Sequence, residues 1–292
     1  ISAVVGRNVP GLEESSIEAA AMDSFLERLR NATVQEAARI LDIPEENEPL
    51  LFISGVLLNR IIKVMDARLI WAPGVSLCDG IAYEYGEKNK ILKESHDFEQ
   101  DIVACAQNIS KRYMGSKRRG ETLEQIALTI FDSMKKIHGL GRRERLLLRI
   151  ATLLHDCGKY ISLVNLGECS YNIIMSTEII GLSHMEREIV ANVVKYNHLE
   201  FDYYDLMGRD SAFSSRDYLT IAKLTAILRV ANGLDRSHKQ KFKNVKTVLK
   251  DEKLIITVDA SQDITLEKGL LARRAHFFEE VFSVQPVIRQ RG

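Results

Sequence analysis

Residues 146–160, LLLRIATLLHDCGKY, decide the fold of this chain because they combine an apolar helix with two polar side chains at its end. Apolar side chains surround nearly the whole circumference of such a helix, so the sequence predicts a helix buried in a core. Gly158 and Lys159 then supply a helix stop. His155 and Asp156 are costly to bury, so we expect them to contact a divalent cation, each other or hydrogen-bonding neighbours.

The overall composition is that of an ordinary globular protein without net charge. The 292 residues are 46% hydrophobic and 27% charged, with 40 basic and 40 acidic side chains. This balance argues against a nucleic-acid binder, and no run of about 18 apolar residues predicts a membrane span. Four widely spaced cysteines fit reduced thiols and a cytoplasmic location. Because the first residue is Ile, we expect a processed chain or a fragment of a longer protein.

The charges are distributed unevenly along the chain. Residues 12–49 carry ten acidic side chains against three arginines. Residues 111–149 carry eleven basic side chains against four acidic ones. The basic stretch is compatible with a polyanionic ligand, although a solvated helical face is the commoner explanation for any single Lys or Arg.

The hydrophobic pattern divides the chain into three regions, residues 1–89, 90–240 and 241–292. The first alternates helices and strands, which is typical of the last part of an α/β layer. Its predicted elements are helices at 13–30 and 33–41, strands at 50–55 and 67–73 with a helix between them, and a final short helix after residue 74. Thr33 and Glu36 have the spacing of a capping box at the start of the second helix.

The second and third regions have different patterns. Residues 90–240 show apolar side chains at helical spacing in one segment after another, which predicts an all-helical domain. Residues 241–292 predict a hairpin at 245–260, a helix at 265–282 and a last strand, which together make a small α+β module. The predicted fold class is therefore mostly α.

An adjacent His–Asp pair after a buried helix, in a helical region with further His and Asp residues, resembles the HD superfamily of metal-dependent phosphohydrolases. The resemblance implies a metal site in which the ligands present are His155, Asp156 and His198. His138 lies between two predicted helices, and we expect it on the surface.

Three other positions where that superfamily supplies ligands depart from its pattern. They are occupied by Thr122, Cys169 and Asn232. Such neutral or weak ligands lower the affinity for a hard divalent cation. We therefore favour a structural role for His155 and Asp156, as a hydrogen-bonded pair at helix ends, over metal binding.

Several longer stretches, in this order, resemble the C-terminal part of the exopolyphosphatase / guanosine pentaphosphate phosphohydrolase (Ppx/GppA) family. They are VSLCDGIAYEYG (75–86), IALTIFDSMKKIHGL (126–140), RLLLRIATLLHDCGKYI (145–161), SYNIIMSTEIIGLSHMEREIVANVVKYNH (170–198), AILRVANGLDRSH (226–238) and EKGLLARRAHFFEEVFSVQPVIR (267–289). The resemblance implies the end of an actin-like ATPase-fold lobe over 1–89, an HD-like helical domain over 90–240 and a small C-terminal domain over 241–292. Nothing in the chain matches the family's phosphate-binding loops, so we assign no catalytic residue.

The resemblance implies hydrolysis of polyphosphate or of the terminal phosphate of guanosine pentaphosphate by the full-length protein, with a divalent metal, Mg or Mn, as the cofactor to be expected there. This chain would contribute polyanion binding or homodimer formation, with polyphosphate or guanosine penta- or tetraphosphate as its partner. The residues expected to line the path of the polyanion are Lys117, Arg118, Arg119, Arg142, Arg143 and Arg145. Two alternatives stay open: an independent HD-type metal-dependent phosphohydrolase, and a regulatory or dimerisation module without a ligand.

Overall fold

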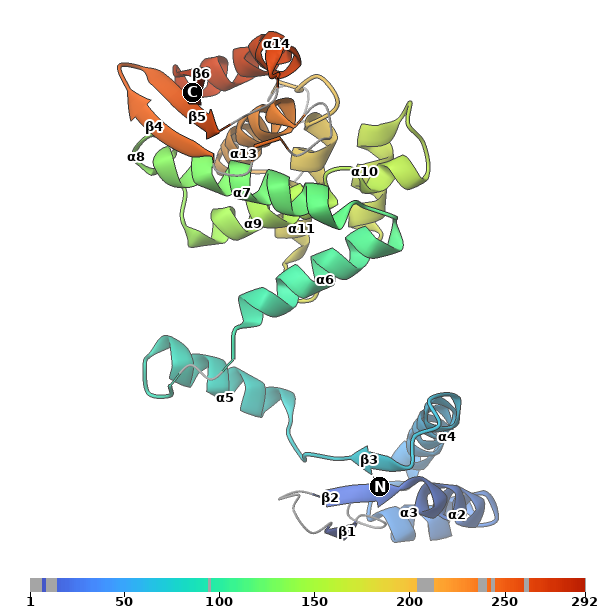
Figure 1. Cartoon of the computed structure of the whole chain (residues 1–292). Coiled ribbons are helices and arrows are strands. Elements are labelled where there is room, and N and C mark those ends of the chain that lie inside the picture. Colours follow the sequence, from blue (N-terminus) through green and yellow to red (C-terminus); the bar gives the residue numbers. More distant parts are fainter. Residues whose placement is uncertain are drawn as a thin grey trace. The chain divides into compact units, whose positions relative to one another are not determined.

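The structure, a computed structural model, describes residues 7–8, 15–93, 96–203, 213–235, 241–242, 245–259 and 263–291 of the chain. The chain divides into two compact units, residues 1–95 and 96–292. Helices predominate, which confirms the predicted mostly α fold class (Figure 1). Within the described ranges, every helix is too short or too polar to cross a lipid bilayer.

The first unit contains a small antiparallel sheet and its helices. The sheet consists, in spatial order, of β1 (Arg7–Asn8), β2 (Ser15–Glu18) and β3 (Leu69–Trp71). The helices are α2 (Ala19–Arg30), α3 (Val34–Leu41), the 3-10 turn η1 (Glu45–Asn47), α4 (Glu48–Val64) and α5 (Leu77–Lys88). One face of α2 forms the core of this unit, where Met22 and Phe25 are buried and pack with Ile17 and Ile62.

One predicted strand in the first unit is wrong. Leu50–Gly55 belongs to α4 and is helical. Pro49 lies in the first turn of that helix, where its missing N–H leaves no hydrogen bond unmade. The apolar run therefore continues into residues 56–64 as a single helix. Leu50 is 68% exposed, so the run of apolar letters did not indicate burial.

Two other predictions for this unit have mixed outcomes. The helix predicted at 13–30 begins only at Ala19, because Ser15–Glu18 pair with β3 as a strand; residues 13–14 lie outside the described residues. The capping box of α3 is confirmed, since the Thr33 hydroxyl accepts from the Glu36 N–H and the Glu36 carboxylate accepts from the Thr33 N–H.

The second unit begins with a bundle of helices. They are α6 (Phe98–Arg112), α7 (Lys117–Ser133), α8 (Lys135–His138), α9 (Arg142–Leu154), the 3-10 turn η2 (Cys157–Tyr160), α10 (Leu166–Met175), α11 (His184–Tyr196) and α13 (Ser215–Leu234). The prediction that α9 is buried is confirmed, because its apolar residues from Leu146 to Leu154 are all at most 6% exposed. Helix α7 begins at Lys117, after the N-cap Ser116, so its first turn carries three basic residues.

A small sheet completes the second unit. Strands β4 (Lys246–Lys250) and β5 (Lys253–Asp259) form the predicted hairpin. Helix α14 (Thr265–Phe282) then leads to β6 (Gln285–Arg291), which pairs in parallel with β5. The sheet and α14 share one hydrophobic core with the helices, since Leu254 and Phe278 belong to the same buried cluster as Leu148 (Figure 1).

Candidate functional site

The end of α9 places His155 and Asp156 inside the second unit, where they are 1% and 8% exposed. His155 terminates the helix, and its Nδ1–H donates to the Thr152 carbonyl at 2.8 Å. Burial lowers the pKa of His155 to about 4, and the positive charge of Arg119 contributes in the same direction. The imidazole is therefore neutral near pH 7. Its Nε2 is buried, lacks a hydrogen-bond partner in the described part of the chain and lies 3.6 Å from Asp156 Oδ2.

The cation next to Asp156 is the guanidinium of Arg119. This side chain comes from the first turn of α7 and is only 8% exposed. Its Nη1 lies 3.4 Å from Asp156 Oδ2, and its Nε lies 3.5 Å from Oδ2 of Asp235 at the end of α13. Its Nη2 donates to Asn232 Oδ1 at 2.8 Å. Arg119 thus joins the ends of three helices that are far apart in the sequence.

His198, the third predicted metal ligand, faces a different group. Its Nε2–H donates to the backbone carbonyl of His155 at 2.7 Å. Burial lowers the pKa of His198 as well, so a neutral imidazole fills this place. Next to it, the Asn232 amide donates to Asn197 Oδ1 at 3.3 Å, which connects α13 to the end of α11. The structure therefore brings the three predicted ligands near each other but does not aim them at one point.

The donor set does not fit an HD-type metal ion as it stands. No group of three or more His, Cys, Asp or Glu side chains in the described ranges is arranged to hold a metal. A divalent cation bound to Asp156 would lie beside the positive charge of Arg119, which is within 3.4 Å of the same carboxylate oxygen. Of the three substituted positions, only Asn232 belongs to this cluster. Thr122 instead bonds the Arg118 carbonyl of its own helix, and Cys169 is partly exposed on α10.

Three of the six predicted polyanion-binding residues are committed to partners within the protein. Besides Arg119, these are Arg143 and Arg145. Arg143 holds Glu186 through a forked pair that includes an Nη2–Oε2 hydrogen bond of 2.9 Å, and this pairing lowers the pKa of Glu186 to about 2. Arg145 makes the same kind of pair with Asp132, at 2.8 Å for both bonds.

The other three candidates are exposed, but they lie at two separate places. Arg145 pairs with Asp132 and Arg149 with Glu124, so α7 and α9 run antiparallel. Lys117 and Arg118 therefore lie at one end of this helix pair and Arg142 at the other, separated by roughly 20 Å or more at 1.5 Å of rise per residue. Arg142 is 76% exposed and meets Glu99 at 3.0 Å.

We call the first of these places the basic end; its members are Lys111, Arg112, Lys117, Arg118 and Lys159, all exposed. A hollow of about 380 Å³ lies there, lined by Lys111, Gly115, Ser116, Lys117 and Gly120 among others. The rings of Tyr113 and Tyr160 are 5.7 Å apart, which brings the turn that carries Lys159 next to the end of α6. The acidic residue at the hollow is Glu121, and its carboxylate is 3.9 Å from Lys117 Nζ.

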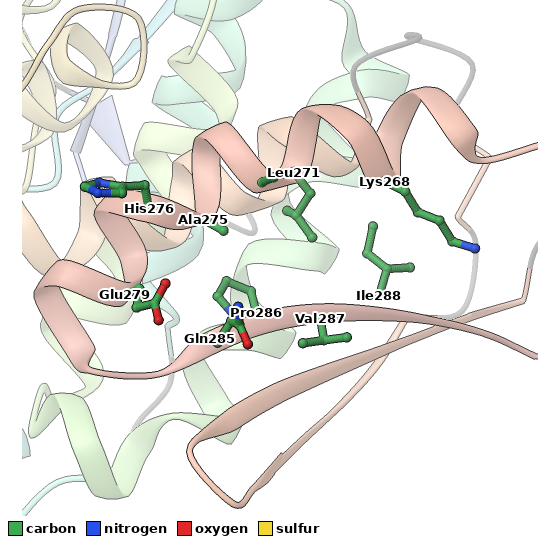
Figure 2. Close-up of a pocket in the computed structure, with 10 residues that line it drawn as sticks. Lys268, Leu271, Ala275, His276, Glu279, Gln285, Pro286, Val287 and Ile288 are labelled. Atoms are coloured by element: carbon green, nitrogen blue, oxygen red, sulfur yellow. The ribbon is translucent and has the colours of Figure 1, made fainter.

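Two further hollows have fewer polar side chains that a ligand could contact. The hollow between α14 and β6, about 360 Å³, has an apolar floor that includes Leu271 and Ile288, and its Lys268 and Glu279 lie at opposite ends (Figure 2). The second lies beside α14 near the end of α11 and contains Arg229 and Arg274. Their guanidinium groups donate to backbone carbonyls around that helix end, which accounts for both side chains structurally.

The prediction that His138 lies on the surface is wrong. The side chain is 1% exposed, its Nε2–H donates to the Phe131 carbonyl at 2.8 Å, and its Nδ1 accepts from the Leu140 N–H. The short polar segment between α8 and α9 gave no sign of this burial. Sequence reasoning also missed Asp235 as a partner of Arg119 and Lys111 as part of the basic end. The signal for a partner such as Arg119 was a buried His–Asp pair that needed a cation. The signal for Lys111 was a run of basic residues that begins upstream of residue 117.

Residues 103–275, more than half of the chain, match the family model described as "Ppx/GppA phosphatase, domain III". A search of curated proteins found no match.

Proposed function

The chain belongs to the Ppx/GppA phosphatase family, and from this we propose that the protein acts on phosphoanhydrides, polyphosphate or guanosine pentaphosphate, with the second unit binding the anionic substrate. In this proposal residues 1–89 are the end of an actin-like lobe, and residues 90–240 and 241–292 are the HD-like and C-terminal domains. Catalysis belongs to parts of the protein outside this set of residues. The free cysteines among the described residues support a reducing, cytoplasmic location.

The observation that carries this proposal is the basic end. Two exposed lysines, Lys111 and Lys117, line one hollow, and the carboxylate among its lining residues is that of Glu121. Arg112 and Arg118 are exposed and directly follow these lysines in the chain. The hollow also offers the hydroxyl groups of Ser110 and Ser116. A chain of phosphates suits such a surface, because each contact is a charge-assisted hydrogen bond and the same contact repeats along the ligand.

The cationic side chains of the basic end can contact a ligand without first breaking a close ion pair, whereas the paired arginines cannot. A guanidinium already bonded to a carboxylate must give up that pair before it can contact a phosphate. Lys117 Nζ, at 3.9 Å from Glu121, has only a loose and solvent-screened pair to lose. We therefore confine the proposed polyphosphate path to the basic end and leave out Arg142, whose guanidinium pairs with Glu99 at 3.0 Å.

The test is polyphosphate binding at two ionic strengths with a charge-reversal variant. We expect binding that weakens strongly between about 0.05 M and about 0.5 M salt, because screening acts on exposed charges. Lys111→Glu with Lys117→Glu should weaken binding by about tenfold or more. The matched control reverses two exposed lysines of the hairpin, Lys250→Glu with Lys253→Glu, and should bind like the wild type. Equal losses in both variants would contradict a localised site.

A second candidate function is an independent metal-dependent phosphohydrolase. The observation in its favour is His155 Nε2, a buried nitrogen without a hydrogen-bond partner in the described residues, 3.6 Å from Asp156 Oδ2. Phosphoester hydrolysis that requires manganese and disappears in Asp156→Asn would support this candidate. The unchanged activity of a metal-free sample would exclude it.

We also propose that the protein forms a homodimer. Helix α4 exposes several large apolar side chains, with Leu57 61% and Val64 72% exposed, and contiguous apolar surface of this kind marks association sites. A mass in solution that stays at one chain over a wide concentration range would contradict this part of the proposal.

A further inference from the structure

A short apolar segment lies on the surface where the turn η2 leads to α10. We call residues 160–164 of this segment the apolar tip. Four of its five side chains are large, apolar and exposed: Tyr160, Ile161, Leu163 at 69% and Val164 at 91%. Single exposed apolar residues are ordinary, but a contiguous group of them marks an association site. The apolar tip therefore calls for a partner.

The backbone of the apolar tip is anchored at its base and hydrogen-bonded along its length. Gly158, just before the tip, donates its N–H to Ser170 Oγ at 2.9 Å, and this joins the base to α10. The N–H groups of Ile161 and Ser162 donate to the Gly158 carbonyl at 2.9 Å and 3.0 Å, and the Asn165 N–H donates to Ser162 Oγ at 3.2 Å. Backbone donors that are already bonded cost less to transfer from water into an apolar medium.

Cationic side chains of the basic end lie next to the apolar tip. Lys159 directly precedes it in the chain and is exposed. The rings of Tyr160 and Tyr113 are 5.7 Å apart, which brings the end of α6 beside the tip. That end of α6 carries two more exposed cations, Lys111 and Arg112. The surface therefore combines aliphatic side chains, tyrosines and positive charges.

The first acidic residue after the apolar tip already has a cationic partner. It is Glu168, in the first turn of α10, and its carboxylate lies 3.0 Å from Lys195 Nζ. Its negative charge is thereby partly compensated. The combined charge and polarity match the surface of an anionic bilayer, where aliphatic side chains enter the acyl region, tyrosines lie at the headgroups, and Lys and Arg contact lipid phosphates.

We propose that the apolar tip, together with Lys111, Arg112 and Lys159, binds the surface of an anionic lipid bilayer. A side chain as exposed as Val164 protrudes from the protein, and a bilayer accepts a protruding group without the matching shape that a protein partner must supply. Surface binding of this kind needs no helix that crosses the membrane. The inference goes beyond the proposed polyphosphate binding and does not rest on it, because the apolar tip takes no part in that function.

The experiment measures co-sedimentation of the full chain with lipid vesicles at low salt. The vesicles contain either phosphatidylcholine alone or equal parts of phosphatidylcholine and phosphatidylglycerol. We expect the wild type to bind the anionic vesicles and to leave the neutral ones, because the cations require negative headgroups. Ile161→Ser with Val164→Ser should lower binding to the anionic vesicles by about fivefold or more. The matched control, Leu219→Ser with Val248→Ser, replaces two exposed apolar residues elsewhere in the second unit and should bind like the wild type.

Two further measurements separate lipid binding from its alternatives. Polyphosphate binding by the tip variant, Ile161→Ser with Val164→Ser, should equal that of the wild type, since both replaced side chains are uncharged. Vesicle binding that depends on the tip supports the inference whether or not the chain binds polyphosphate. Equal vesicle binding by the wild type and the tip variant overturns it. It is also overturned if, without lipid, the tip variant is a monomer where the wild type is a dimer, because the tip is then a protein interface.

Discussion

Arg118 and Arg119 are neighbours in the sequence and carry the same side chain, yet the protein uses them differently. Arg118 is exposed in the first turn of α7, whereas Arg119 is turned inward, 7% exposed, onto two buried carboxylates and an amide. Adjacent helical residues point about 100° apart, which is enough to place one in solvent and the other in the core. A charge counted from the sequence is therefore not yet a charge that a ligand can reach.

The same contrast extends over the basic stretch as a whole. Arg143 and Arg145 neutralise Glu186 and Asp132 within the fold, while Lys111 and Lys117 surround a hollow open to solvent. The first group stabilises the packing of helices. The second group is the part of the stretch that we propose for polyphosphate.

The largest effect should come from replacing the two neighbouring arginines one at a time. Arg119→Ala should lower the free energy of unfolding by about 3 kcal/mol or more, since it removes a buried cation that lies within 3.5 Å of two buried carboxylates. Arg118→Ala should change it by no more than about 0.5 kcal/mol, as expected for an exposed residue. Urea unfolding of both variants in EDTA measures the difference. Similar values for the two would remove the contrast between them.

A smaller effect concerns the histidine beside Arg119. The pKa of His155, about 4 in the folded protein, lies below the ordinary value of 6.5, so the unfolded chain takes up the proton first. The contribution of the neutral His155 to the free energy of unfolding is therefore fully present above about pH 6.5 and is lost as the pH falls towards 4. The loss attributable to this residue is about 3 kcal/mol.

The corresponding measurement is the free energy of unfolding from pH 7 to pH 4 for the wild type and His155→Gln. The variant should show a distinctly shallower decline. His184→Gln, which alters an exposed histidine at the start of α11, is the matched control and should follow the wild type. An unchanged slope in His155→Gln would show that His155 is not buried in its neutral form.

The sequence predicted the second unit better than the first, for a physical reason. Helix α9 has apolar residues around its circumference, and α14 has clear boundaries, so periodicity was sufficient to find both. Leu50–Gly55 is a short apolar run, and such a run fits a strand or a helix equally well until its neighbours are known. There Pro49 was a helix-start signal that favoured α4.

The site was predicted only in part. The cost of burying His155 and Asp156 correctly indicated that they need partners, and a cation was among those expected. The sequence could not show that the cation would be Arg119, 36 residues earlier, because that contact depends on how α7 packs against α9 and α13. Long-range pairing of this kind leaves no periodic signal. The role of His198 as a metal ligand and the polyphosphate path remain predictions.

The most direct test of the division between internal and available charge is a polyphosphate titration of two double variants at low salt. Lys117→Glu with Arg118→Glu changes the basic end, and Arg143→Gln with Arg145→Gln changes the internally paired arginines. We predict that the first weakens binding by about tenfold or more, while the second stays within about twofold of the wild type. If the Arg143 and Arg145 variant loses as much affinity as the first, the paired arginines also bind the ligand and the division is wrong.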